Sequence, residues 1–192
     1  YENMGDATFQ NISSEANTNY AGFGMGVDVG DYNLDGYMDM YITNLYDNVL
    51  YKNNGDGTFE NVGAALGVND PGMGWGNVFA DFDNDRLPDI YVVNDTYFSP
   101  YSNVLYHNTG SGFEIVSEGD PCESPYGGYA TVAADLDDDG LVDLLVANNG
   151  APGVQLFQNK STGTGHYISF YLEGVASNRD AVGAKIEIHT TA

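Results

Sequence analysis

The sequence DYNLDGYMD at residues 31–39 is the first of three copies of one acidic loop. The others are DFDNDRLPD at 81–89 and DLDDDGLVD at 135–143, so successive copies begin 50 and 54 residues apart. Self-similarity at a fixed period of roughly 20 to 50 residues indicates a repeat architecture. Each copy carries an oxygen-bearing side chain at positions one, three, five and nine, so the repeat has chemical as well as structural meaning.

An aromatic hairpin alternates with the acidic loop along the chain. It reads LYKNNGDGTF at residues 50–59 and LYHNTGSGF at 105–113, with shorter versions YENMGDATF at 1–9 and LFQN at 156–159. Apolar and aromatic residues on both sides of a turn that contains Asn and Gly predict two antiparallel strands with a tight connection.

The segments between these two signatures predict the remaining strands, because they are short, rich in Val, Ile, Tyr and Phe, and bounded by turn residues. One repeat would consist of a Gly-rich inner strand, the acidic loop, an apolar strand and the two hairpin strands. The expected inner strands are 24–29, 74–80 and 128–134, and the expected apolar strands are 38–43, 90–93 and 144–147. No helix is expected.

Four-stranded antiparallel repeats predict an all-β fold of β-propeller blades, with small residues in the innermost strand where the blades crowd the axis. We expect propeller repeats over 1–160 and a separate β segment at 161–192. The repeats would be a half blade at 1–14 and blades at about 20–62, 72–116 and 127–160. Propellers close with roughly four to eight blades, so about three blades predict a fragment or an open arc. Its unpaired sheet edges would favour pairing with neighbouring copies, as a homo-oligomer or a filament.

The acidic loops predict about three Ca²⁺ ions. Calcium takes roughly six to eight oxygen ligands, and a tight loop supplies them from alternate side chains and a backbone carbonyl at position seven. The expected ligands are Asp31, Asn33, Asp35, the Tyr37 carbonyl and Asp39; Asp81, Asp83, Asp85, the Leu87 carbonyl and Asp89; and Asp135, Asp137, Asp139, the Leu141 carbonyl and Asp143.

Magnesium is the rival ion, but it favours a small octahedral shell that keeps several waters, so a loop rich in protein oxygens favours calcium. The second loop is irregular, because Arg86 stands where Gly36 and Gly140 occupy the sharp turn. If that position requires a positive φ, Arg costs about 1 to 2 kcal/mol there. We therefore expect the second site to be the weakest.

The residues also resemble a known family. The stretch GMGWGNVFADFDNDRLPDIY at 72–91 is similar to the FG-GAP or VCBS repeats of integrin-α-like propellers. The stretches HYISFYLEG at 166–174 and SNRDAVGAKI at 177–186 resemble the ASPIC/UnbV module that follows such repeats in cartilage-acidic-protein-like secreted proteins. These resemblances imply an extracellular location, calcium in the inter-strand loops, and adhesion or recognition of a protein or glycan rather than catalysis.

Composition restricts the partners. The 192 residues include 28 acidic and 5 basic ones, for a net charge of -23, which disfavours nucleic acid and anionic membranes as partners. A hydrophobic fraction of 42% indicates a folded chain rather than an acidic disordered tail. No apolar stretch approaches the roughly 20 residues that span a bilayer. The single cysteine, Cys122, has no partner for an internal disulfide.

Three functions remain open from the sequence. The first is a non-enzymatic, extracellular, calcium-binding adhesion or recognition module, in which Tyr97, Tyr101 and Tyr126 could form an aromatic binding surface. The second is a subunit of an extracellular filament. The third is a polysaccharide-active enzyme, which would need a facing pair of carboxylates; Asp28, Asp95 and Asp138 are its candidates. His107 takes the repeat position of Lys52 and is expected to point outward from its strand.

Overall fold

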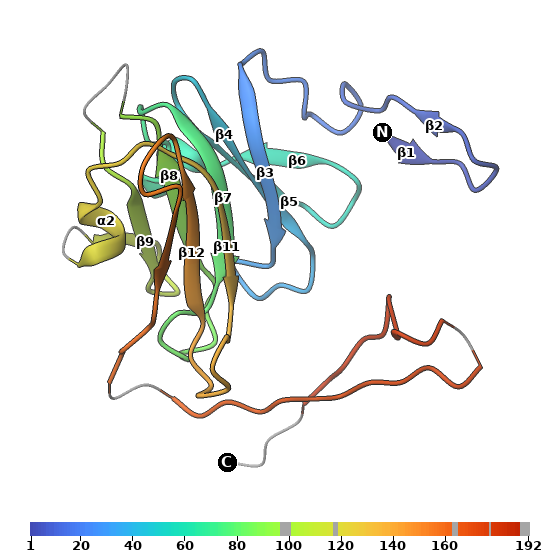
Figure 1. Ribbon diagram of the computed structural model, residues 1–192. Coiled ribbons are helices and arrows are strands. Elements are labelled where there is room, and N and C mark those ends of the chain that lie inside the picture. The colour runs from blue at the N-terminus through green and yellow to red at the C-terminus, as the bar shows by residue number, and fades with distance from the viewer. Residues whose placement is uncertain (97–100, 117–118, 163–164, 177, 189–192) are drawn as a thin grey trace.

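Antiparallel strands form all the sheets of this protein, as the computed structural model shows (Figure 1). The structure describes residues 1–96, 101–116, 119–162, 165–176 and 178–188, so Tyr97 lies outside the described residues. Two sheets have four strands each. The first sheet contains β3 (Gly24–Gly30), β4 (Asp39–Asn44), β5 (Val49–Asn53) and β6 (Phe59–Asn61). The second sheet contains β7 (Gly74–Ala80), β8 (Asp89–Asn94), β9 (Val104–Asn108) and β10 (Phe113–Val116). The predicted all-β fold with four-stranded antiparallel blades is therefore confirmed.

The third sheet has three strands within the described part of the chain, β11 (Gly128–Ala134), β12 (Asp143–Asn148) and β13 (Val154–Phe157). A two-stranded hairpin, β1 (Glu2–Asn3) and β2 (Phe9–Gln10), extends away from the three sheets (Figure 1). The sheets form an open arrangement and do not close into a ring.

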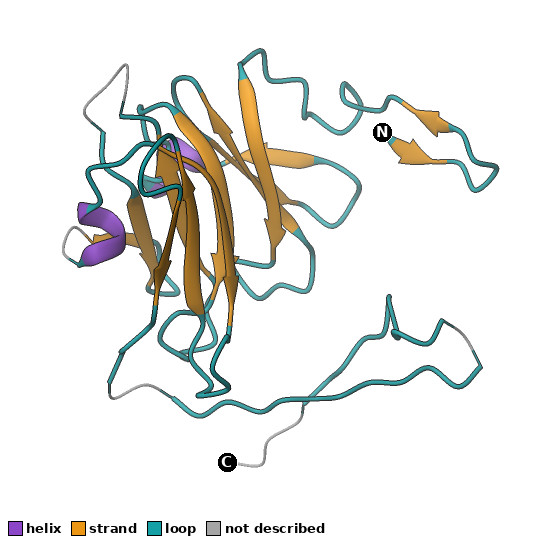
Figure 2. Cartoon of the chain, in the orientation of Figure 1, coloured by secondary structure: helices purple, strands orange, loops and turns teal. Residues whose placement is uncertain are grey.

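The described connections include two helices of four residues each, α1 (Gly63–Leu66) and α2 (Asp120–Glu123) (Figure 2). The expectation that the chain has no helix is wrong in this detail. A single turn is too short to show a helical hydrophobic period, so the sequence pattern could not reveal it. Neither helix is long or apolar enough to cross a bilayer within the described residues.

The core lies between neighbouring sheets, and β8 contributes to both sides of it. Successive side chains of a strand point to opposite faces of the sheet. Ile90 and Val92 accordingly pack with Tyr41 and Leu50 of the first sheet. Tyr91 and Val93 pack on the other face with core residues of the third sheet, Leu144 and Val146. All six residues of β8 are buried, because this strand is covered on both faces.

The inner strands of neighbouring sheets approach each other closely. A Cβ on Gly26 of β3 would lie 2.3 Å from the carbonyl oxygen of Trp75 in β7. A Cβ on Gly76 of β7 would lie 2.9 Å from the Cα of Ala130 in β11. Real Cβ atoms do not tolerate such contacts with backbone, so glycine at these positions allows the blades to stack as the sequence predicts.

Asparagine side chains at the ends of the third strands tie each sheet to the one before it. Asn108 Nδ2 donates to the carbonyl of Pro88 in the second acidic loop at 3.0 Å and to that of Tyr32 in the first acidic loop at 2.7 Å. Asn159 Nδ2 repeats the contact one sheet later, with Val142 at 3.0 Å and Phe82 at 2.8 Å. The hairpin signature therefore positions the acidic loops.

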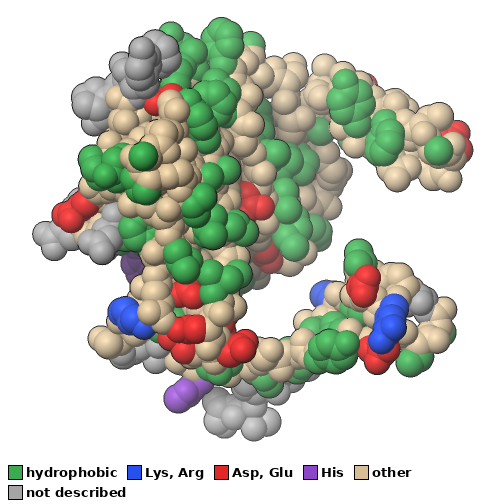
Figure 3. All heavy atoms as spheres, in the orientation of Figure 1, with side chains coloured by type: hydrophobic (Ala, Val, Ile, Leu, Met, Phe, Trp, Pro, Cys, Tyr) green, Lys and Arg blue, Asp and Glu red, His purple; other side chains and the backbone are tan. Residues whose placement is uncertain are grey.

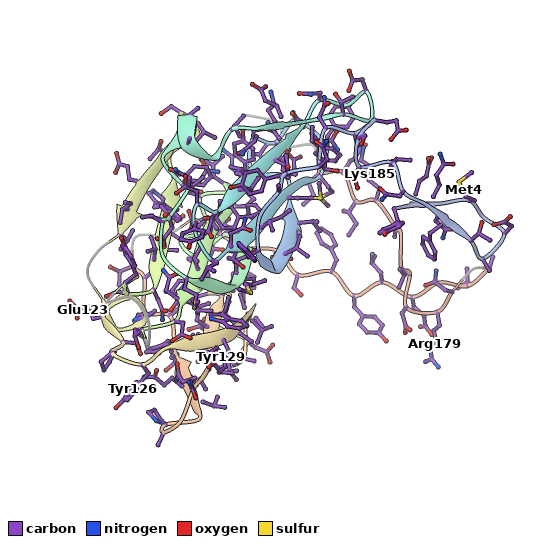
Figure 4. The ribbon with its side chains drawn as sticks, turned by 90° about the horizontal axis from the view of Figure 1, so that it is seen from above. Met4, Glu123, Tyr126, Tyr129, Arg179 and Lys185 are labelled. Atoms are coloured by element: carbon purple, nitrogen blue, oxygen red, sulfur yellow. The ribbon has the colours of Figure 1, made fainter. Side chains whose placement is uncertain are left out.

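The C-terminal segment contains no strand within residues 158–162, 165–176 and 178–188, whereas the sequence predicts a β segment there (Figure 2). Its apolar side chains Tyr171 and Val175 are exposed, so the segment lacks the packing that would favour a sheet. Figure 4 shows Arg179 of this segment on the same side of the molecule as Met4 of the β1–β2 hairpin, away from Tyr126 and Tyr129 of the third sheet.

Candidate metal centres

Each acidic loop connects the inner strand of a sheet to its second strand. The three loops follow β3, β7 and β11 and lead into β4, β8 and β12. Acidic side chains gather at the lower end of the sheets in Figure 3, where the loops after β7 and β11 lie. The second and third loops also touch, because Asn84 Nδ2 donates to the Gly140 carbonyl at 3.0 Å.

The three loops share one backbone conformation. Positions four and six have positive φ angles in every copy, namely 56° and 89° at Leu34 and Gly36, 58° and 81° at Asn84 and Arg86, and 59° and 85° at Asp138 and Gly140. Arg86 therefore adopts the left-handed conformation that glycine supplies in the other two loops. The position of Arg86 thus requires a positive φ, which is the condition under which the sequence predicts the second metal site to be the weakest.

The first carboxylate of each loop holds this turn. Asp31 accepts from the N–H of Asp35 at 3.0 Å and of Gly36 at 2.8 Å. The same pairs of bonds recur at Asp81, with distances of 3.1 and 2.8 Å, and at Asp135, with distances of 3.2 and 3.0 Å. Because the chain curls around this residue, the side chains at positions three and five are drawn toward it.

The loops bring their predicted ligands together to different extents. Carboxylate oxygens of Asp81, Asp83 and Asp85 lie within 4.8 Å of one another, and so do those of Asp135, Asp137 and Asp139. In the first loop Asn33 and Asp31 both accept from the Asp35 N–H. The position-seven residues Tyr37, Leu87 and Leu141 donate their N–H groups to the position-five carboxylates at 3.0, 2.8 and 2.9 Å.

The carboxylates at position nine have a second role that sequence reasoning missed. Asp39, Asp89 and Asp143 are 0%, 2% and 3% exposed, and both oxygens of each accept backbone N–H groups. Asp39 accepts from Tyr32 at the loop start at 3.2 Å and from Asn53 in the third strand at 2.7 Å. Asp89 and Asp143 make the equivalent pairs with Phe82 and Asn108 and with Leu136 and Asn159. We call each of these buried position-nine carboxylates, which joins the start of its loop to the third strand, a latch carboxylate. The Asn that recurs in the hairpin signature, whose N–H group each latch carboxylate accepts, is the sequence signal for it.

Burial makes the carboxylates of Asp39 and Asp89 costly to ionise. It raises the pKa of Asp39, and it raises the pKa of Asp89 to about 6 despite the opposing hydrogen bonds from backbone N–H groups. A cation beside the loop lowers that cost, because an opposite charge favours the ionised form.

His107 points into the second loop, and the expectation that it faces outward is wrong. Its Nδ1 lies 3.1 Å from Asp89 Oδ1 and 3.7 Å from Asp83 Oδ2. The matching residue of the third sheet, Gln158, also contacts the position-three carboxylate of its own loop, Asp137. This strand position therefore faces the loop, which the alternation pattern alone could not show at a strand end.

The candidate carboxylates for glycan cleavage have other places in the fold. Asp28 in β3 accepts from the N–H of Phe79 in β7 at 2.8 Å and so joins two sheets. Asp95 is buried directly after β8, and Asp138 is exposed in the third loop. A cavity of about 510 Å³ lies between the second and third sheets, and its described lining, which includes Phe82, Leu144 and Phe157, contains no acidic residue.

Comparison with known families finds a match to the FG-GAP-like repeat over residues 31–92 and 87–146. The two matched segments together cover more than half of the chain and contain all three acidic loops. A comparison with curated proteins finds no match. The matched segments do not reach the C-terminal stretch at 161–192.

The left-handed conformation of Arg86 yields a prediction. Replacing it by glycine should raise the free energy of unfolding in chelator by about 1 kcal/mol, because a left-handed cost of about 1 to 2 kcal/mol is removed and partly offset by the greater unfolded-state entropy of Gly. Urea denaturation measures the change. Arg86→Ala, which keeps a Cβ at the same φ, is the matched control and should show no such gain; an equal gain would trace the effect to the guanidinium instead.

The latch carboxylates yield a second prediction. Asp39→Asn should lower the free energy of unfolding by about 1 to 3 kcal/mol in chelator, because an amide can accept only one of the two buried N–H groups. The exposed residue Asp35, a predicted ligand, supplies the control, since Asp35→Asn should have a much smaller effect without metal. Equal losses in the two variants, measured by urea denaturation, would remove the distinction between latch and ligand.

Proposed function

The chain belongs to the FG-GAP-like repeat family, which indicates an integrin-like β-propeller module, and on this premise we propose that it is an extracellular calcium-binding module for adhesion or recognition. Calcium has a structural role in this proposal, and the module is not an enzyme.

One observation carries the calcium proposal: three loops share one backbone conformation, and in each the first carboxylate accepts from the N–H groups of positions five and six. In two of them, three carboxylates lie within 4.8 Å of one another. Like charges so close together destabilise the fold unless a cation lies among them, and the chain offers only 5 basic residues against 28 acidic ones. A loop rich in hard oxygen donors from the protein favours calcium over the smaller magnesium ion, which keeps several waters.

Calcium in these loops would stabilise the contacts between sheets. The backbone carbonyls of Tyr32 and Phe82, which lie inside the first and second loops, accept the asparagine bonds from the following sheet. An ion that fixes a loop therefore also fixes the position of the next blade. Extracellular calcium modules bind at roughly 10⁻⁴ to 10⁻³ M, so the site would remain filled outside the cell and empty in the cytosol.

Aromatic side chains supply a surface for the protein or glycan partner in this proposal. Tyr101, Tyr126 and Tyr129 are exposed, and the ring of Tyr129 lies 4.9 Å from that of Trp75. Tyrosine offers contact area and a hydrogen-bonding group at low entropic cost, which suits recognition surfaces.

Self-assembly is a second candidate, and the outer face of the first sheet favours it. Val27 and Val29 of β3 are 62% and 53% exposed. Phe79, the residue of β7 that matches Val29 in the repeat, is half-buried between sheets. An apolar sheet face that lacks a neighbour is suited to a head-to-tail contact between copies, and such a contact gives a filament when it does not close.

The calcium proposal predicts a change in thermal stability. Calcium at about a hundred times its dissociation constant should stabilise the native state by about 2.7 kcal/mol, which raises the melting temperature by several degrees at this chain length. Scanning calorimetry in calcium, magnesium and chelator, with sodium chloride matching the ionic strength, measures the effect. The combined variant Asp35→Ala, Asp85→Ala and Asp139→Ala, which removes an oxygen ligand from each loop, is the control and should lose the response. An unchanged melting temperature on chelation would defeat the proposal.

The self-assembly candidate predicts concentration-dependent mass. Sedimentation velocity should show species larger than a monomer at high concentration, and Val27→Glu with Val29→Glu should return the protein to monomers. Tyr46→Glu, which changes an exposed apolar residue in the connection between β4 and β5, should leave assembly intact. Monomers of the unmodified chain at every concentration would dismiss this candidate.

A further inference from the structure

The second acidic loop differs chemically from the other two. Each hairpin signature has one residue directly before the asparagine whose N–H group binds the latch carboxylate. This residue is Lys52 in the first sheet, His107 in the second and Gln158 in the third. A neutral imidazole is the only one of these three side chains that is a common metal ligand, and it suits zinc and other first-row transition ions rather than calcium.

We propose that His107, Asp83 and Asp89 form a mixed nitrogen and oxygen site for a transition-metal dication, with Zn²⁺ as its representative. The proposal deepens the proposed function, because it assigns a separate ion to one of the metal loops. It does not require that the first and third loops bind calcium.

The three ligand atoms already have spacings close to those of a coordination shell. His107 Nδ1 is 3.1 Å from Asp89 Oδ1 and 3.7 Å from Asp83 Oδ2, and all three groups lie within 4.8 Å of one another. Nitrogen and oxygen ligands about 2.0 to 2.1 Å from a tetrahedral zinc ion are roughly 3.3 Å apart. An ion therefore fits between the three groups with small side-chain rotations.

The surroundings combine a fixed ligand with an accessible side. Asp89 is 2% exposed and is held by N–H groups of Phe82 at 3.2 Å and Asn108 at 2.8 Å. Bonds of this kind orient a metal-binding carboxylate and commonly change metal affinity by about ten- to a hundred-fold when removed. The side chains of His107 and Asp83 are 31% and 39% exposed, so an ion can enter and keep a water as a fourth ligand.

Asp83 belongs to both possible sites of this loop. It lies with Asp81 and Asp85 in the oxygen cluster and with Asp89 and His107 in the mixed cluster. Binding of zinc at the mixed cluster therefore withdraws Asp83 from the oxygen cluster, together with Asp89, the predicted calcium ligand at position nine. Zinc and calcium compete at this loop alone, while the first and third loops contain no histidine.

The test is zinc binding by the tag-free chain in millimolar calcium, measured by competition with a chromophoric chelator. The unmodified chain should bind one Zn²⁺ tightly, and Co²⁺ in its place should give the intense visible absorption of a tetrahedral nitrogen and oxygen site. His107→Gln, which installs the residue of the third sheet, should weaken zinc binding by at least about ten-fold. If the unmodified chain does not bind zinc, the contact of His107 with Asp89 is only a hydrogen bond, and the proposal is overturned.

Controls separate this proposal from misfolding and from the calcium proposal. His166→Gln should leave zinc affinity unchanged, and so should Asp139→Asn in the third loop. The melting temperature of His107→Gln in chelator checks that it folds. The calcium response of the unmodified chain is measured separately, so either proposal can fail alone. Equal zinc affinity of His107→Gln and the unmodified chain would assign zinc to the acidic loops or to other histidines and overturn the proposal.

In case His107→Gln does not fold, the unmodified chain supplies an independent readout. The chain contains 3 histidines, so their ring proton resonances can be followed by NMR during a zinc titration. The resonances of His107 should shift at one equivalent of zinc, before those of the other two. Shifts confined to the other histidines would contradict the proposed site.

Discussion

Mutual repulsion of carboxylates in the three loops is the constraint on which the structure depends. Two like charges about 4 Å apart repel by about 4 kcal/mol at an effective dielectric constant near 20, which is large against the total stability of a domain. The fold nevertheless curls each loop around its first aspartate and buries the ninth, as at Asp39 and Asp89. Backbone N–H groups offset part of this cost. Cations among the side chains offset the rest in our account.

The same loops determine how the sheets stack. A buried carboxylate joins the start of each loop to the third strand of its own sheet, and an asparagine on that strand reaches the loop of the preceding sheet. Loop, strand and neighbouring blade are thus connected by contacts between residues far apart in sequence. The strand β8, which follows the second loop, is covered on both faces and contributes residues to two cores. The acidic loops and the packing of the blades are in this way parts of one arrangement.

Much of this architecture could be read from the sequence, because period and spacing are local properties. The acidic loops, the inner glycine strands and the propeller-type sheets follow from three repeated copies. The bonds of Asp39 to Asn53 and the turn of His107 into its loop depend on which strands pair, and periodicity does not specify that. The one-turn helices α1 and α2 are too short to have a period. Local composition favours a strand in the C-terminal stretch, but Tyr171 and Val175 are exposed there and the described residues form no strand.

Anomalous scattering from crystals grown in calcium tests the central claim most directly. The account predicts a calcium peak in each of the three loops, with oxygens from positions one, three and five at roughly 2.3 to 2.6 Å and the weakest occupancy beside Arg86. Loops without any peak in calcium-rich buffer, with their carboxylates turned toward solvent, would contradict it.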